Sequence, residues 1–206
     1  MTSRRLFLVR HGETDWNLAG RLQGRHDIPL NDLGREQAAE TAKVIHRLAG
    51  DPVPLGYVSS PLGRAAQTMA ILRAELGLPP DGFRRDARFA EISFGRWEGC
   101  TWLDLRRRDP EAVAQRDADP WHYTPPGGES YAALTVRAVE ALGELDADTV
   151  VVTHGGVVRA LLHALTSMPP AVAADLPVRQ GAVYLVADGR FEMATPDGGL
   201  LRRGRR

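Results

Sequence analysis

Short apolar runs separated by longer amphipathic stretches recur along the chain. The runs 6–9 and 149–152 consist of apolar residues and a single threonine, and a less continuous run covers residues 55–59. Continuous apolar runs of this length are typical of strands buried on both faces of a parallel sheet. Two further runs, 181–187 and 190–194, flank an Asp-Gly dipeptide that favours a tight hairpin turn. The pattern therefore predicts three buried strands and one β-hairpin.

Between these runs, apolar side chains recur at steps of three and four residues, which is the period of a helix with one buried face. The clearest helix follows Asn31, a good N-terminal cap, and stops at Gly50. The predicted helices cover residues 31–49, 62–76, 102–108, 129–145 and 156–165.

The alternation of strands and helices indicates an α/β fold. We expect three layers, α/β/α, around a mostly parallel central sheet with a hairpin at its edge. A length of 206 residues fits a single domain, which we assign to residues 1–206. The weakly patterned stretch 92–128 ends in a loop rich in proline and glycine, and we expect it to form a small inserted cap over the carboxyl ends of the strands.

Composition limits the partners of the chain. Its 26 basic and 26 acidic residues balance, which argues against a nucleic acid or an anionic membrane as the main partner. The single cysteine, Cys100, excludes an intrachain disulfide and a metal site built from thiolates. No apolar stretch is long enough to span a membrane, so we expect a cytoplasmic protein. The sequence leaves room for a homodimer, and we expect the basic end 202–206 to be unstructured.

The candidate chemistry lies where two of the predicted strands end. The first strand is followed by Arg10-His11-Gly12, and the run 149–152 is followed by Thr153-His154-Gly155-Gly156. In open α/β sheets, ligands bind in the crevice outside the carboxyl ends of the strands. Glycines let the backbone approach a ligand closely, and the segment after each histidine can direct N–H groups at an anion. We therefore expect His11 and His154 to share one site.

A third strand end fits the same pattern. Ser59-Ser60-Pro61 follows the run 55–59, and Arg64 then falls in the first turn of the predicted helix. Two guanidinium groups, from Arg10 and Arg64, would surround the histidines in an otherwise neutral protein. Such forked donors match the oxygens of a phosphoryl group. Each residue alone is more simply a structural histidine or a surface arginine, and the functional interpretation rests on their combination.

These residues belong to a set of motifs that resembles the histidine phosphatase superfamily, also called the phosphoglycerate mutase-like family. The motifs follow the order of that family over nearly the whole chain, at Leu8–Asn17, Leu22–Gly24, Pro29–Gly34, Ser59–Thr68, Glu91–Gly99, Pro126–Ser130 and Thr153–Gly156.

The resemblance implies a reaction and a set of roles. His11 would be the nucleophile and would carry the phosphoryl group as phosphohistidine, while Glu91 would be the general acid that protonates the leaving alcohol. The remaining implied roles are phosphate binding, with His154 as a cation in the transition state. The implied phosphate ligands are Arg10, Asn17, Gln23, Gly24, Arg64, His154 and Gly155.

Several alternatives remain at this level. The separation in sequence between Glu91 and His154 is shorter than in the mutases of this family. The motifs Glu91–Gly99 and Pro126–Ser130 also resemble those of the small phosphatases, which include α-ribazole phosphatase and broad-specificity members. This favours hydrolysis of a small phosphorylated metabolite over a mutase reaction or a non-catalytic phospholigand-binding module.

A metal held by the two histidines and a carboxylate is a rival chemistry. Arg10 and Arg64 would repel such an ion, so we expect no metal and no cofactor.

Overall fold

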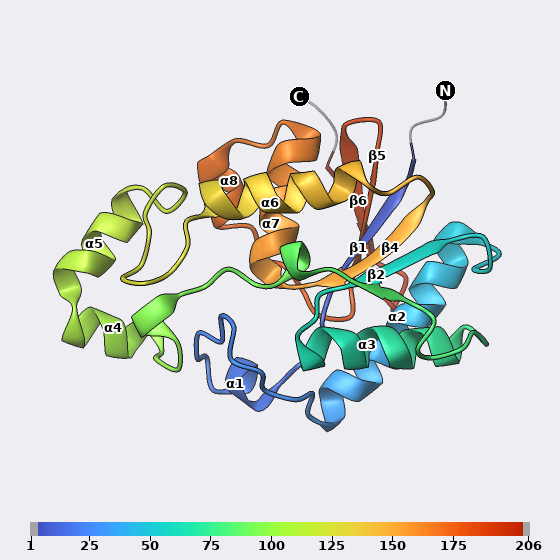
Figure 1. Cartoon of the computed structure of the whole chain (residues 1–206), viewed down its shortest axis with the longest axis horizontal. Coiled ribbons are helices and arrows are strands. Elements are labelled where there is room, and N and C mark those ends of the chain that lie inside the picture. Colours follow the sequence, from blue (N-terminus) through green and yellow to red (C-terminus); the bar gives the residue numbers. More distant parts are fainter. Residues whose placement is uncertain (1–3, 204–206) are drawn as a thin grey trace.

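The computed structural model describes residues 4–203, and a seven-stranded sheet lies at its centre (Figure 1). Four neighbouring strands run parallel to one another, and three antiparallel strands extend the sheet beyond β1. The strand order is β3 (Arg84–Arg85), β2 (Gly56–Ser59), β4 (Thr149–Thr153), β1 (Leu6–Arg10), β5 (Val183–Ala187), β6 (Arg190–Ala194) and β7 (Leu200–Arg203).

Helices cover both faces of the sheet, so the α/β class is confirmed (Figure 1). One face carries α2 (Asp32–Ala49) and α3 (Gly63–Glu75), and the other carries α6 (Tyr131–Gly143), α7 (Gly155–Thr166) and α8 (Pro170–Ala174). Alternate residues of one strand enter the two cores, because successive side chains of a strand point to opposite faces. Leu6 and Leu8 of β1 pack in the core under α6 and α7, and Phe7 packs in the core under α2 and α3. This explains the continuous apolar run from which the strand was predicted.

The stretch between the sheet and α6 builds a separate projection at one end of the molecule (Figure 1). The short 3-10 helix η1 (Ala87–Phe89) still packs against α6, and the projection contains the 3-10 helix η2 (Gly95–Trp97), α4 (Trp102–Arg108) and α5 (Pro110–Ala118). Trp97, Leu105 and Val113 form a small hydrophobic cluster of its own. The predicted cap, residues 92–128, corresponds to η2, α4, α5 and the loop before α6.

The structure adds elements that the sequence pattern did not predict, among them α5, α8, β7 and the short helix α1 (Asp15–Leu18). The expectation of an unstructured basic end was wrong for Arg202 and Arg203, which belong to β7 and pair with β6. A strand edge pairs through backbone groups, which every residue offers, so side-chain charge did not reveal this strand. Residues 204–206 lie outside the described residues.

Within 4–203, no helix has both the length and the apolar composition needed to cross a membrane.

Candidate active site

The two histidines meet because their strands are neighbours. β1 and β4 pair in parallel with Arg10 opposite Thr153, so the residues that follow, His11 and His154, leave the sheet side by side. The backbone N–H of His11 donates to the carbonyl of Thr153 at 2.9 Å. The ring centroids lie 5.1 Å apart at an interplanar angle of 62°, and both side chains are buried. Both rings can therefore contact one small anion.

The ring of His11 is held in one tautomer. Its Nδ1 lies 2.7 Å from the carbonyl oxygen of Gly12, which can only accept, so Nδ1 carries the hydrogen. Nε2 is then an acceptor, and Nε of Arg64 donates to it at 3.2 Å. Burial, followed by the charges of Arg64 and Arg10, holds the pKa of His11 well below its usual value. His11 is thus a neutral imidazole at neutral pH, with the lone pair on Nε2.

Arg64 is the second residue of α3 and is completely buried. Its Nη1 donates to the carbonyl of His26 at 2.6 Å and its Nη2 to the carbonyl of Gly24 at 2.8 Å. Burial lowers the pKa of Arg64, but an arginine stays charged at neutral pH. Because these partners are carbonyls rather than carboxylates, the positive charge remains available to an anion at His11.

His154 caps the N-terminus of α7 and is fixed by a serine. Its Nε2 lies 2.7 Å from Oγ of Ser60, and this hydroxyl oxygen also accepts from the N–H of Leu62 at 3.3 Å. If the Ser60 hydroxyl donates to Nε2, the ring hydrogen sits on Nδ1, which is buried and unpartnered. Burial and the charge of Arg64 hold the pKa of His154 well below its usual value. The free site therefore favours a neutral ring, and the cationic form that we expected requires the negative charge of a bound anion.

Arg10 is the third positively charged or donating group at this edge of the sheet. Nη1 of Arg10 donates to the carbonyl of Val178 at 2.8 Å, while its Nε is buried without a partner. Among the described side chains, four buried polar atoms lack a partner, and three of them belong to predicted site residues: Arg10 Nε, Gln23 Oε1 and His154 Nδ1. Buried polar groups are normally hydrogen-bonded, so the orphaned donor Nε of Arg10, joined by Nδ1 of His154 when Ser60 donates to that ring, indicates a place for an acceptor ligand.

The carboxyl group of Glu91 lies against the first turn of α7, which follows His154. Its Oε1 accepts from the N–H of Ile92 at 2.9 Å and from the N–H of Gly156 at 3.1 Å, and its Oε2 receives only a longer 3.4 Å contact from Gly156. A Cβ at position 156 would collide with Oε1, so a larger residue there would displace the carboxyl group. The carboxyl group is thereby held by the backbone of Gly156, two positions after His154, and Oε2 is the oxygen with the weaker contact.

The other predicted phosphate ligands are placed less directly. Gly155, the first residue of α7, lies beside Arg10, whose Nε would be 3.7 Å from a Cβ at that position. Gly24 contacts Arg64 through its carbonyl. The Oδ1 atom of Asn17 accepts from the N–H of Thr14 at 3.2 Å and from Nε2 of Gln180 at 2.9 Å, so its carbonyl is already engaged.

Sequence reasoning missed the roles of Ser60, Glu98 and Arg137. The carboxylate of Glu98 accepts from the N–H of Arg25 at 3.2 Å, from Nδ1 of His26 at 2.7 Å and from the N–H of Phe94 at 3.0 Å. It thus ties the loop that holds Arg64 to the segment after Glu91. Ser60 and Glu98 both lie in the motifs quoted above, but nothing in a motif says which side chain a residue contacts.

A cavity of about 310 Å³ opens between the cap and the helices α6, α7 and α8. Its lining includes Ile92, the chain neighbour of Glu91, and the aromatic side chains of Phe94, Trp97, Trp102, Tyr123 and Tyr131. The charged groups on its wall are Arg116, Glu129, Arg159 and Asp175, which balance in sign. This is the volume of a small-molecule site, and its chemistry suits an uncharged group with apolar faces and polar substituents.

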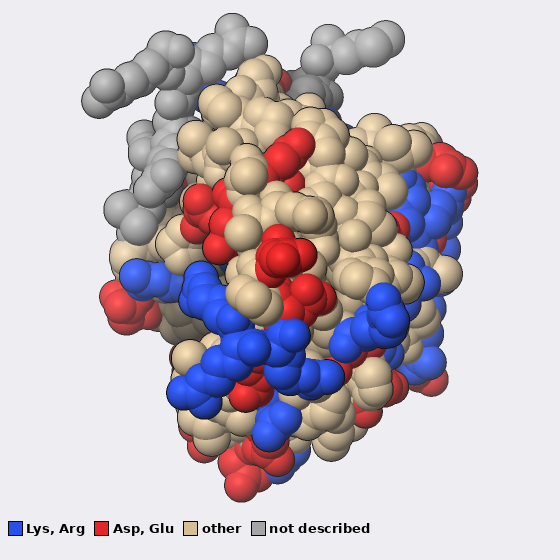
Figure 2. Space-filling model, turned by 90° about the vertical axis from the view of Figure 1, so that its left-hand side faces the viewer, with Lys and Arg blue, Asp and Glu red and all other residues tan. Residues whose placement is uncertain are grey.

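The face of the molecule on which the cap lies carries clustered basic side chains. Figure 2 shows Lys and Arg side chains gathered across the lower part of this face. The exposed residues Arg106, Arg107 and Arg108 of α4 lie in the cap. Positive surface potential attracts anionic substrates and raises the rate of encounter.

The described part of the chain holds no group of three or more His, Cys, Asp or Glu side chains arranged to bind a metal ion. The positive charge that an anion would meet here comes from Arg10 and Arg64.

Comparisons with known proteins agree on one family. The model of the histidine phosphatase superfamily (branch 1) matches residues 6–193. Glucosyl-3-phosphoglycerate phosphatase of Mycobacterium tuberculosis is 37% identical over 185 residues, covering 83% of this chain and 79% of that protein. Adenosylcobalamin/alpha-ribazole phosphatase of Salmonella typhimurium is 32% identical over 182 residues, covering 86% and 87%. The native structure of mycobacterial glucosyl-3-phosphoglycerate phosphatase matches with a TM-score of 0.77 at 30% identity, over 99% of this chain and 100% of that one.

Proposed function

Since this chain belongs to the histidine phosphatase superfamily, we propose that it hydrolyses phosphate monoesters of small metabolites through a phosphohistidine at His11. One observation carries the proposal. The rings of His11 and His154 lie 5.1 Å apart, beside Arg64 and the orphaned Nε of Arg10. A phosphoryl group with three charged oxygens satisfies these donors together.

In the first step, Nε2 of His11 attacks the phosphorus in line with the leaving oxygen. The N–P bond forms while the ester P–O bond breaks, and Glu91 gives its proton to the leaving oxygen, which departs as an alcohol. Arg10, Arg64 and His154 donate to the equatorial oxygens, where negative charge is concentrated in the transition state.

In the second step, water attacks the phosphohistidine. Glu91, now a carboxylate, takes a proton from the water as the new P–O bond forms. The N–P bond breaks, its electron pair returns to Nε2, and inorganic phosphate leaves. The guanidinium groups of Arg10 and Arg64, together with the ring of His154, supply the positive charge and the donors, so the reaction as proposed needs no metal ion.

We assign the cavity under the cap to the alcohol part of the substrate. It adjoins Glu91, the proposed acid, through Ile92, so a leaving oxygen near Glu91 would point its substituent into the cavity. The aromatic wall and balanced charges favour an uncharged substituent that carries hydroxyl groups or a ring. In this scheme residues 92–128 form the cap that decides which ester is accepted.

The experiment is a panel of phosphorylated metabolites assayed for phosphate release, with 3-phosphoglycerate assayed in parallel for isomerisation. We expect phosphate release by the wild-type chain, acid-labile phosphate bound to the protein during turnover, and no activity from His11→Ala. Isomerisation without phosphate release would identify a mutase, and turnover by His11→Ala would remove the nucleophile assignment. The absence of turnover on every ester would favour a phospholigand-binding module. The homodimer, the cytoplasmic location and the lack of a nucleic-acid partner stay predictions of the sequence.

A further inference from the structure

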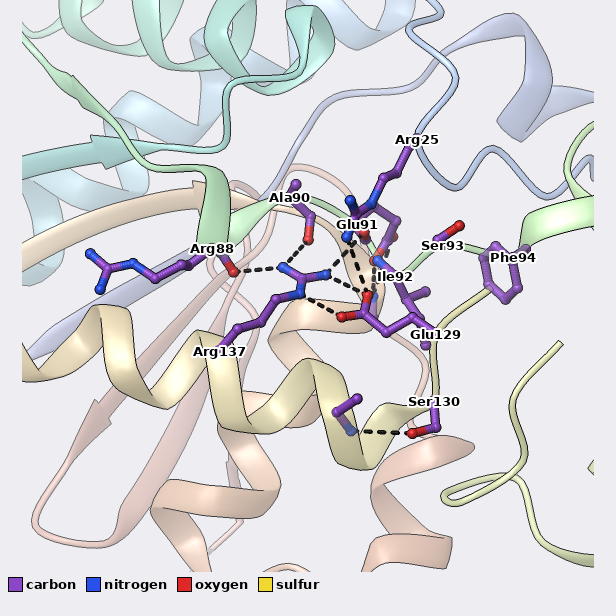
Figure 3. Close-up of polar contacts among 12 residues, drawn as sticks. Arg25, Arg88, Ala90, Glu91, Ile92, Ser93, Phe94, Glu129, Ser130 and Arg137 are labelled. Carbon is purple, nitrogen blue, oxygen red and sulfur yellow. Dashed lines mark hydrogen bonds and ion pairs between the residues drawn. The ribbon is translucent and has the colours of Figure 1, made fainter. Parts of the chain in front are cut away.

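Arg137, on the second turn of α6, joins α6 to the segment that carries Glu91 (Figure 3). Its guanidinium makes five hydrogen bonds, three to backbone carbonyls of that segment and two to one carboxylate. We propose that Arg137 is a positioning residue for the general acid Glu91. This inference rests on the proposed function, because it assigns Arg137 a task in that same reaction.

Part of the backbone before Glu91 is held by other groups: the N–H of Ala90 donates to the carbonyl of Ala87 at 3.0 Å, and the carbonyl of Phe89 accepts from Oγ1 of Thr153 at 2.7 Å. η1 is only three residues long, and the segment that follows it joins no strand. Arg137 supplies the donors instead: Nη1 donates to the carbonyls of Arg88 at 2.6 Å and Ala90 at 2.8 Å, and Nη2 donates to the carbonyl of Glu91 at 3.2 Å. One rigid, planar group therefore fixes three carbonyls of the chain that leads to the acid.

Glu129 holds the guanidinium in place from the other side. Its carboxylate accepts from Nε and Nη2 of Arg137, each at 2.7 Å, in the forked geometry that suits this pair. Its backbone N–H donates to the carbonyl of Ser93 at 2.8 Å. Arg25 approaches the same carboxylate at 3.6 Å from the loop across the site (Figure 3). The pair of Arg137 and Glu129 therefore grips the chain on both sides of Glu91.

Glu91 is consequently fixed at both of its ends. Arg137 holds its backbone carbonyl, and the N–H of Gly156 holds its carboxyl group at 3.1 Å. A general acid must lie within hydrogen-bond reach of the oxygen that it protonates, and a displacement of about 1 Å can lower the rate by roughly 100-fold. Without Arg137 the backbone carbonyl of Glu91 loses this hydrogen bond, and the carboxyl group can move away from the leaving oxygen.

The chemistry of the leaving group provides a selective test. An alkoxide must be protonated as it leaves, whereas p-nitrophenolate is stable without a proton. Misplacement of Glu91 therefore slows the transfer from an alkyl phosphate and affects p-nitrophenyl phosphate far less. A general loosening of the fold slows both substrates alike.

The experiment measures kcat and KM of the full chain on glycerol 2-phosphate and on p-nitrophenyl phosphate. For Arg137→Gln we expect kcat on the alkyl ester to fall by about 10- to 100-fold, and by less than about threefold on the aryl ester, with KM little changed. Arg137→Lys keeps the positive charge but loses the planar set of N–H donors. Glu91→Gln removes the proposed acid itself and therefore shows how the two substrates respond to the loss of that acid. Arg137→Lys should lie between wild type and Arg137→Gln, and it serves as the test variant if Arg137→Gln does not fold.

Arg88→Gln is the matched control. The side chain of Arg88 points away from Glu91 and pairs with Asp86 at 2.7 Å and Glu144 at 2.6 Å (Figure 3). Its loss should affect both substrates equally. Equal losses on the two substrates for the Arg137 variants, or no loss, would overturn the inference. If Glu91→Gln itself shows no preference between the substrates, the failure lies in the assignment of Glu91 as the acid.

Discussion

The hydroxyl oxygen of Ser60 lies 2.7 Å from Nε2 of His154, and both residues are completely buried. The contact joins the end of β2 to the end of β4. It decides which nitrogen of the ring faces the site. With Nε2 engaged by Ser60, Nδ1 is the ring nitrogen left without a partner, and it is the atom that the proposed mechanism assigns to the phosphoryl group. The orientation of the second histidine thus depends on a residue with no direct part in the reaction.

Replacement of this serine should impair catalysis and stability together. Ser60→Ala leaves Nε2 of His154 buried without a partner, which costs about 1–3 kcal/mol of unfolding free energy, and it releases the tautomer. We expect kcat to fall by roughly 10- to 100-fold, the usual effect of losing a partner that orients a functional group. Ser59→Ala is the control, because Oγ of Ser59 donates to the carbonyl of Ser60 at 2.8 Å and its contact does not involve the ring. Equal kcat values for the two variants would contradict this prediction.

The two histidines should make stability depend on pH. Their pKa values in the folded chain are lowered, first by burial, from the value of about 6.5 in an unfolded chain. Below pH 6.5 the unfolded chain therefore binds protons that the folded chain does not, so the unfolding free energy falls as pH decreases and is largest above pH 6.5. Urea unfolding at several pH values between 5 and 8 measures this slope. His154→Asn should flatten it, whereas the exposed His46→Asn should not; an unchanged slope in His154→Asn would refute the prediction.

A methyl group at position 156 should displace the acid. Its Cβ would collide with Oε1 of Glu91 and would lie 3.1 Å from Cγ2 of Ile92. Gly156→Ala should therefore lower kcat on alkyl phosphates by roughly 10- to 100-fold, and much less on p-nitrophenyl phosphate. Gly143→Ala is the matched control, since a Cβ there meets no atom within 4 Å, and it should leave both rates unchanged. Wild-type rates in Gly156→Ala would show that the contact with Glu91 is dispensable.

Chelation should not affect the reaction. The positive charge at the site comes from Arg10 and Arg64, which no chelator removes. We expect the rate of phosphate release to be the same before and after dialysis against EDTA. Loss of activity that is restored by added Mg²⁺, Mn²⁺ or Zn²⁺ would instead support a metal held by the histidines.

Vanadate should inhibit the wild-type chain in competition with substrate. Its five-coordinate form imitates the phosphoryl group between His11 and the leaving oxygen, and transition-state analogues bind about 10²–10⁸-fold more tightly than substrates. Arg64→Lys, which keeps a charge but loses the fork, should weaken inhibition. Inhibition of equal strength in this variant would argue against contact between Arg64 and the equatorial oxygens.

The sequence by itself determined the elements on which the site is built. The apolar runs that become β1 and β4 are visible because both faces of these strands are buried, and each run ends at a histidine. The helix after Asn31 could be predicted because its cap and its terminal glycine are local signals. Periodicity, caps and turns depend on residues a few positions apart, so they can be recognised in one sequence.

Only the tertiary structure decided which residues act together. Ser60 and His154 are 94 positions apart, and Arg137 reaches a carbonyl 46 positions away. The adjacency of β1 and β4 follows from the strand order of the sheet, which no local pattern encodes. The partners of Arg137 include backbone carbonyls, which every residue carries, so side-chain identity could not reveal them. Burial then set the protonation of both histidines, because the cost of charging a ring depends on the solvent and the charges that the folded chain places around it.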